Sequence, residues 1–246
     1  MVSNFRNWLF SIPFLLGFAV VMVSADLLQR VFKNNVEASF KICNFVCNST
    51  LNLLKVAGVR FKYEIPDQLK EKLDNPRPKI FISNHQSLMD IAIFYKLFPE
   101  QQLRFIAKQE LSKGLPYVSL ALRTISHCLI VRQNRSLALE SLRNFAKIMR
   151  DEGCGIVIFP EGTRAREGVM KRFKAGGFAC LVEELEEVEV VPVTFNGSWK
   201  IAKHKLMPIP YGTNVLVTVH DSQIVQKDDD LVSSLKMIED KIGSKL

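Results

Sequence analysis

Beyond residue 78, short apolar runs alternate with stretches of helical periodicity. Runs rich in β-branched and aromatic side chains predict strands, at residues 80–82, 103–107, 128–131, 156–159, 188–195 and 215–220. Apolar positions repeated every three or four residues predict helices, at residues 135–150, 174–187 and 231–242. Strands that alternate with helices indicate an α/β sheet covered by helices on both faces.

An apolar stretch covers residues 7–25 without a charged side chain. Its length is close to the minimum for a membrane-spanning helix. A cleaved signal peptide is one alternative, but the run is long and rich in Trp and Phe. A buried core helix is another, but Pro13 and Gly17 disfavour it. We therefore predict membrane attachment, with the orientation left open because basic residues flank the stretch on both sides.

Residues 36–56 predict a second helix of a different kind. A polar stripe recurs at helical spacing opposite an apolar face, as in helices that lie in a membrane interface or pack on a domain. A polar segment between Pro66 and Pro78 follows. We expect two parts: membrane-associated helices over residues 1–58 and a domain that carries the chemistry over residues 59–246.

Charge and cysteine content narrow the possible partners. The net charge of +8 and the pI near 9.3 suit nucleic acid, an anionic membrane or a phosphorylated substrate. The five cysteines include no Cys-x-x-Cys pair, which argues against a disulfide framework and against a zinc site. Nucleic acid is the weakest option, since no aromatic array is interleaved with the basic residues.

The stretch Asn84-His85-Gln86-Ser87-Leu88-Met89-Asp90 follows a predicted strand. Its His and Asp cannot meet on a straight strand, and within one helix they would lie roughly 140° apart. They meet if the strand ends near Ser83 and His85 lies in the turn. Ser87 would then cap a helix that has Asp90 in its first turn. Such an Asp holds the imidazole in one tautomer as a base, whereas a His that fills a polar gap is the alternative.

A second motif, Phe159-Pro160-Glu161-Gly162-Thr163-Arg164, follows another predicted strand. Pro and Gly around an acidic residue predict a tight turn, and Arg164 then lies at the carboxyl end of the strand, where α/β sheets bind ligands. A surface Glu-Arg ion pair is the alternative. Together the two motifs resemble the first and third sequence blocks of the glycerolipid acyltransferases, and in particular of the 1-acylglycerol-3-phosphate (lysophosphatidic acid) acyltransferases.

This resemblance implies a mixed, mainly parallel sheet flanked by helices, and it implies site residues. The catalytic pair would be His85, as general base, and Asp90, which orients it. Shorter segments resemble further parts of the family pattern. Residues 108–111 resemble its Lys-x-Glu-Leu turn, and residues 173–176 resemble the continuation of its third block. Residues 126–132 resemble its second block, with Ser126 and His127 at substituted positions. The implied substrate-binding residues are Glu161, Gly162, Arg164, Arg132, Lys174 and Lys108. For Lys108 a solvated lysine at a strand end is the alternative.

The resemblance also implies an enzyme of phospholipid biosynthesis. It would move a fatty acyl group from acyl-CoA or acyl-ACP (acyl carrier protein) to the sn-2 hydroxyl of lysophosphatidic acid, and phosphatidic acid would be the product. The hydroxyl would attack the thioester directly, with no metal and no cofactor besides the acyl donor. Family members dock on one leaflet through two helices. We expect association with the phospholipid surface of the inner (cytoplasmic) membrane, the catalytic domain being on the cytoplasmic side, although a single span is the alternative.

Two other functions fit the same residues. The acceptor could be another lysolipid, such as lyso-ornithine lipid, or glycerol 3-phosphate. The chain could also be a catalytically silent protein that binds anionic membrane through its basic face, but adhesion requires neither His85 nor Asp90.

Overall fold

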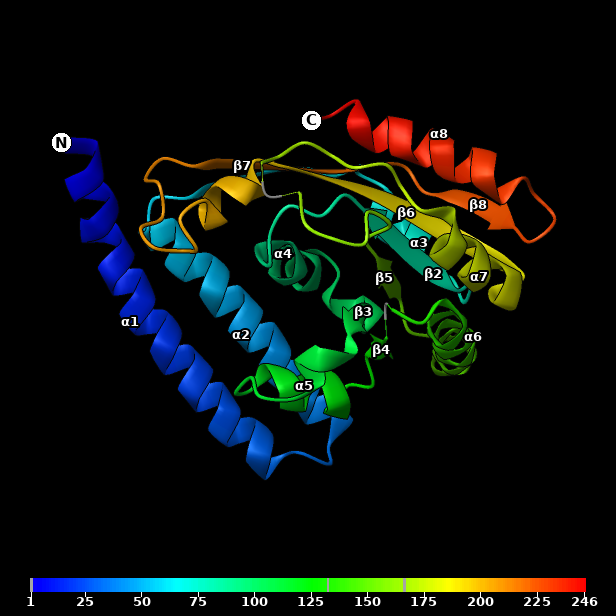
Figure 1. Ribbon diagram of the computed structural model, residues 1–246, viewed down its shortest axis with the longest axis horizontal. Coiled ribbons are helices and arrows are strands. Elements are labelled where there is room, and N and C mark those ends of the chain that lie inside the picture. The colour runs from blue at the N-terminus through cyan, green and yellow to red at the C-terminus, as the bar shows by residue number, and fades with distance from the viewer. Residues whose placement is uncertain (1, 132, 166) are drawn as a thin grey trace.

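The computed structural model describes residues 2–131, 133–165 and 167–246, and one mixed sheet runs through it (Figure 1). The strand order is β1-β7-β6-β2-β5-β3-β4, with β8 paired to β6 as a branch. The strands are β1 (Arg60–Glu64), β2 (Lys79–Ser83), β3 (Arg104–Lys108), β4 (Cys128–Ile130), β5 (Ile156–Ile158), β6 (Glu187–Asn196), β7 (Asn214–Val219) and β8 (Gln223–Gln226). The pairings of β6 with β7 and with β8 are antiparallel, and the other pairings are parallel.

Helices cover both faces of this sheet. The helices are α1 (Val2–Val31), α2 (Val36–Val56), α3 (Leu69–Leu73), α4 (Met89–Leu97), α5 (Val118–Thr124), α6 (Arg135–Glu152), α7 (Ala175–Leu185) and α8 (Leu231–Gly243). Figure 1 shows α1, α2 and α4 on one side of the sheet and α6, α7 and α8 on the other. Alternate side chains of β2 point to opposite faces of the sheet. Phe81 packs in the cluster that includes α2 and α4, whereas Ile80 and Ile82 pack in the cluster that includes α6, α7 and α8.

The expected α/β fold is confirmed, and so are the strands and helices that apolar patterns predicted. Helix α6 shows why such elements are readable from sequence. Asn134 Oδ1 accepts from the Leu137 N–H at the start of this helix, and Gly153 ends it in the left-handed region, at φ 67°. Strands β1 and β8 were not predicted, because both are short and mix polar with apolar positions.

Helices α1 and α2 form an antiparallel pair, yet α2 also belongs to the main core. Phe40, Leu51 and Leu54 of α2 are buried in the same cluster as residues of α4 and β7. Among the described residues, α1 is the one helix long and apolar enough to cross a membrane. Its outer face stays exposed, including Leu16 at 64% and Val20 at 66% of their surface.

The carboxyl ends of β2, β5 and β3 meet at one edge of the sheet, because these strands are parallel neighbours. Both sequence motifs follow these ends: one after Ser83 of β2, the other after Ile158 of β5. Parallel topology therefore brings together two turns that are far apart in the chain.

Candidate active site

Side-chain amides hold the turn between β2 and α4 to the end of β6. Asn84 Nδ2 donates to the Phe195 carbonyl oxygen at 2.8 Å, and the Phe195 N–H donates to Asn84 Oδ1 at 2.8 Å. Gln86 Oε1 accepts from the Gly197 N–H at 3.0 Å. Both amide side chains are buried. They extend the strand pairing past the end of β2 and fix the backbone on either side of His85.

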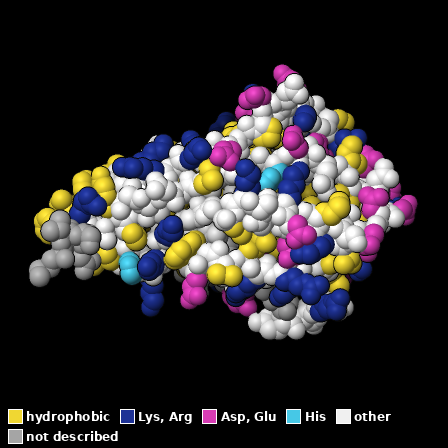
Figure 2. Space-filling model, turned by 90° about the horizontal axis from the view of Figure 1, so that it is seen from above, with side chains coloured by type: hydrophobic (Ala, Val, Ile, Leu, Met, Phe, Trp, Pro, Cys, Tyr) yellow, Lys and Arg dark blue, Asp and Glu magenta, His cyan; other side chains and the backbone are white. Residues whose placement is uncertain are grey.

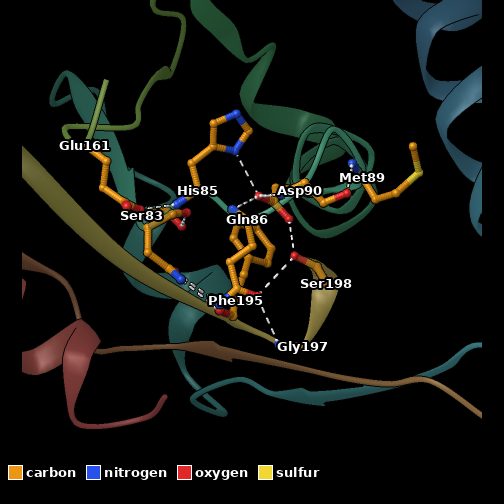
Figure 3. Close-up of polar contacts among 11 residues, drawn as sticks. Ser83, His85, Gln86, Met89, Asp90, Glu161, Phe195, Gly197 and Ser198 are labelled. Carbon is orange, nitrogen blue, oxygen red and sulfur yellow. Dashed lines mark hydrogen bonds and ion pairs between the residues drawn. The ribbon is translucent and has the colours of Figure 1, made fainter. Parts of the chain in front are cut away.

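The two predicted catalytic residues meet in this turn (Figure 3). His85 Nδ1 lies 2.9 Å from Asp90 Oδ2, which also accepts from the N–H groups of Gln86 at 2.7 Å and Ser87 at 2.8 Å. Asp90 is completely buried in the first turn of α4. The expected capping by Ser87 is confirmed: Ser87 Oγ accepts from the Met89 N–H at 3.2 Å, and Leu88, directly before the start of α4, already has helical φ and ψ of −62° and −22°. The carboxylate of Asp90 accepts from further free amides of the same turn.

The His85 imidazole is packed on one face and open at one edge. Its ring stacks on Phe159, with centroids 4.1 Å apart and planes 20° apart, and its side chain keeps 15% of its surface exposed. Because Nδ1 faces the carboxylate of Asp90, Nδ1 carries the proton and Nε2 has a free lone pair. Figure 3 shows the second ring nitrogen directed away from Asp90. The ring can therefore accept a proton from a ligand.

Glu161 joins the two motifs through backbone amides. One carboxylate oxygen accepts from the His85 N–H at 2.7 Å, and the other accepts from the Lys171 N–H at 2.8 Å. Its side chain is buried. Burial raises the pKa of the Glu161 carboxyl above its usual value, and the two amide hydrogen bonds oppose that shift. These contacts link two loops, whereas the sequence suggested contact with Arg164 or with an acceptor.

The other predicted ligands in the second motif lie beside the His85 turn. The Ala165 N–H donates to the His85 carbonyl oxygen at 2.7 Å, which places the backbone of the preceding residue, Arg164, next to the His85 turn. Gly162 has a positive φ of 71°, and Lys174 Nζ lies 3.5 Å from the point where a Cβ of this glycine would be. Arg164 is partly exposed and Lys174 is exposed. Arg164, on the loop beside His85, and Lys174, at the start of α7 beside Gly162, are thus two cations close to this loop.

The remaining predicted ligands are less closely connected. Lys108 is exposed at the carboxyl end of β3, which is separated from β2 by β5. It shares the edge of the sheet with His85. Arg132 lies outside the described residues.

Two other imidazoles, one partly buried and one buried, have structural partners. His127 Nδ1 accepts from the Phe105 N–H at 2.9 Å, and burial together with the nearby Arg104 charge lowers its pKa to about 3. His220 Nε2 lies 2.8 Å from Thr194 Oγ1, and its pKa is lowered to about 4, mainly by burial. Both rings are therefore neutral near pH 7. His85 differs from them in having a carboxylate partner and an open nitrogen.

Sequence reasoning missed the residues that connect the His85 turn to the end of β6 and to the segment that follows it. Ser198 Oγ donates to Asp90 Oδ1 at 2.6 Å, and Asn84 and Gln86 connect the same two segments. The positions of Asn84 and Gln86 on either side of His85 were a local signal that these residues belong to the site. The sequence contains no such signal for Ser198, because nothing near Ser198 indicates that it meets Asp90. Among the described residues, no group of three or more His, Cys, Asp or Glu side chains could hold a metal ion.

Comparison with known proteins agrees with this fold and these motifs. Residues 63–196 match the family model described as Acyltransferase, which covers both motifs. The chain therefore belongs to the acyltransferase family. A solved structure with 24% identity, the 1-acyl-sn-glycerophosphate acyltransferase PlsC of Thermotoga maritima, shares the fold with a TM-score of 0.68 over 98% of this chain and 94% of its own.

Curated relatives make the resemblance more specific. The chain is 31% identical over 195 residues to a 1-acyl-sn-glycerol-3-phosphate acyltransferase of Chlamydomonas reinhardtii, covering 78% of this chain and 53% of that protein. It is 28% identical to one of Limnanthes douglasii, over 72% of this chain and 62% of that protein. A Helicobacter pylori protein of the same name is 29% identical, over 77% and 72% of the two chains. The chain thus spans between half and two thirds of the Chlamydomonas and Limnanthes proteins.

Proposed function

We propose that this protein transfers a fatty acyl group from a thioester to the sn-2 hydroxyl of 1-acylglycerol 3-phosphate, yielding phosphatidic acid for phospholipid biosynthesis. The observation that carries the proposal is the contact of the partly exposed His85 ring with the buried Asp90 carboxylate, which leaves Nε2 open beside the loop that carries Arg164. The names of the curated relatives support this acceptor.

The reaction follows from the geometry of the pair. His85 Nε2 takes the proton of the acceptor hydroxyl while its oxygen attacks the thioester carbonyl carbon. A C–O bond forms, the C–S bond breaks, and the proton on Nε2 passes to the leaving thiolate. Asp90 stabilises the imidazolium that exists between these two proton transfers. No acyl-enzyme intermediate is needed, because the hydroxyl attacks the donor directly.

The cations bind and position the acceptor. Arg164 offers a planar fork to phosphate oxygens, and Lys174, at the N-cap of α7 and close to Gly162, adds a point charge. Lys108, at the end of β3, extends this phosphate site in our proposal. Arg132, which lies outside the described residues, is a further phosphate ligand in the proposal, and Gly162 leaves room for the phosphate. Glu161 contributes by holding the cationic loop against the His85 turn. A phosphate bound there would place the hydroxyl near the base, which is a proximity contribution to the rate.

The acyl donor is acyl-CoA or acyl-ACP in this proposal. Both present the same thioester to His85, so the chemistry above does not distinguish them. They differ in the carrier, which a donor competition assay would reveal.

We also propose that residues 1–58 attach the domain of residues 59–246 to one leaflet of the cytoplasmic membrane, from the cytoplasmic side. Helix α1 is tied to the rest of the molecule near both ends: the Tyr211 N–H donates to Asn7 Oδ1 at 2.9 Å, and the Tyr117 N–H donates to Asp26 Oδ1 at 2.6 Å. These attachment points are roughly 28 Å apart along the helix. A spanning α1 would draw one of the two polar loops across a hydrocarbon core about 30 Å thick, so attachment in one leaflet fits better.

Acylation of 1-acylglycerol 3-phosphate in detergent or liposomes tests the proposal. Phosphatidic acid and free thiol would be measured together, with either donor. We expect equimolar products from the unaltered protein and a loss of about 10³-fold in His85→Ala. His204→Ala, which removes an exposed imidazole, is the matched control and should retain activity. No product from a folded preparation with either donor would overturn the assignment and lead to assays of other lysolipids.

A further inference from the structure

The buried carboxylate of Asp90 receives a hydrogen bond from outside its own turn. Its Oδ2 is occupied by the imidazole and by two backbone amides, whereas its Oδ1 accepts from Ser198 Oγ at 2.6 Å. Both side chains have no exposed surface. Figure 3 shows Ser198 on the side of Asp90 away from the His85 ring. Ser198 follows the end of the family-matched segment, residues 63–196.

We propose that Ser198 is a positioning residue for the His85 base: its hydroxyl sets the orientation and the basicity of Asp90, and through Asp90 the readiness of His85 to accept a proton. This inference rests on the proposed general-base function of His85. Ser198 does not touch the reacting atoms, so its effect passes through the carboxylate.

The backbone fixes the position of this hydroxyl. Gly197 turns the chain out of β6 at φ 92°, and a Cβ there would lie 2.4 Å from the Asn214 carbonyl oxygen, so only glycine fits. The Gly197 N–H donates to the buried Gln86 Oε1. The turn that precedes Ser198 is therefore locked to the turn that contains His85, and the hydroxyl has little freedom to move away from Asp90.

The contact also has a direct chemical consequence. A hydroxyl that donates to an ionised carboxylate makes a short, charge-assisted bond and withdraws negative charge from the oxygens. Without it, the carboxylate would attract the imidazolium proton more strongly. The protonated, inactive form of His85 would then persist to higher pH, and release of its proton to the leaving thiolate would slow.

A matched pair of serines separates this role from simple packing. Ser222 Oγ donates to the buried carboxylate of Glu189 at 2.6 Å, the same length as in the Ser198 contact. Glu189 lies near the start of β6, at the opposite end of the strand from Ser198. Ser198→Ala and Ser222→Ala therefore each remove a serine–carboxylate bond of the same length, a buried one beside the proposed base and a partly buried one remote from it. Ser198→Thr keeps a hydroxyl, and Ser198→Cys keeps a weaker donor of similar size.

The experiment is the pH dependence of kcat and KM for these variants, with thermal unfolding measured in parallel. For Ser198→Ala we expect kcat to fall about ten- to a hundredfold with KM little changed, and the pH of half-maximal rate on the acid side to rise by roughly half a unit or more. Ser198→Thr should restore the profile and Ser198→Cys should lie between. Ser222→Ala should keep the unaltered kcat and profile. Equal profiles for Ser198→Ala and Ser222→Ala would overturn the proposal.

A titration of the His85 ring by NMR provides a second readout that needs no substrate. The His85 signals, assigned by their loss in His85→Ala, should titrate at higher pH in Ser198→Ala than in the unaltered protein. If no lysolipid is acylated, this measurement still tests the link from Ser198 to His85. An unchanged titration in folded Ser198→Ala, or in Ser198→Cys if the alanine variant does not fold, would overturn it.

Discussion

The backbone N–H of His85 donates to the buried Glu161 carboxylate at 2.7 Å, although the two residues are 76 positions apart. The same carboxylate accepts from the Lys171 N–H. One side chain therefore holds both the turn that carries the proposed base and the loop that carries the cations. Figure 2 shows one face of the molecule, on which Lys and Arg side chains are spread over much of the surface.

Glu161→Gln should change how stability depends on pH. Burial raises the pKa of the Glu161 carboxyl above the ordinary value of 4.5, so the folded protein keeps this proton to higher pH than the unfolded chain. The contribution of the carboxyl to stability is greatest below pH 4.5 and declines as the pH rises through the folded-state value. The free energy of unfolding of the unaltered protein, relative to Glu161→Gln, should therefore fall as the pH rises above 4.5.

Denaturant unfolding in detergent at several pH values measures this difference. Glu167→Gln, an exposed change in the same loop, should track the unaltered protein. A relative stability that rises with pH would show that the two amide hydrogen bonds outweigh burial.

Asp90→Asn should lower kcat by about 10³-fold with a smaller effect on KM. An amide in this buried position has one oxygen for several donors and directs an NH2 group at N–H or O–H groups. Without the carboxylate, the imidazole is no longer held in one tautomer, and the imidazolium that forms during the reaction is no longer stabilised. Steady-state kinetics and a circular dichroism spectrum would check this, and a folded Asp90→Asn variant with near-normal kcat would contradict the orienting role.

Arg164→Ala should raise KM for 1-acylglycerol 3-phosphate by about ten- to a hundredfold, the worth of a charge-assisted hydrogen bond. For a zwitterionic lysolipid the same change should cost much less. Arg150→Ala, an exposed change in α6 on the other face of the sheet, is the control for net charge. Equal losses with both acceptors would argue that Arg164 does not recognise the phosphate.

Attachment to one leaflet predicts that both ends of α1 are reachable from the same side of the membrane. The five native cysteines are buried, so single cysteines at Phe5 and at Asn34, both exposed, can be labelled selectively. A maleimide that does not cross sealed vesicles should react with both positions from one side. Reaction of only one position would indicate a spanning helix. Val20→Asp on the exposed face of α1 should reduce vesicle binding, whereas Val232→Asp on α8 should not.

Much of the site is local in sequence and was readable there. His85 and Asp90 lie five residues apart, so a strand, a turn and a helix in the right order were enough to predict their contact. Strands β2, β5 and β6 could be predicted from the sequence because they are buried on both faces and therefore consist of nearly continuous apolar runs. Strand β1 was missed because its burial is only partial at a sheet edge.

The sequence by itself determined the α/β class, the two motifs, the long apolar helix and the contact between His85 and Asp90, since each depends on residues within one or two elements. The tertiary structure alone decided that Glu161 bonds the His85 backbone, that Ser198 bonds Asp90 across 108 positions and that Asn84 bonds Phe195 across 111. It also decided that α1 is held at both ends. These contacts join segments that only the sheet topology makes neighbours, and hydrogen-bonding groups carry no sequence mark of the partner they will meet once the chain is folded.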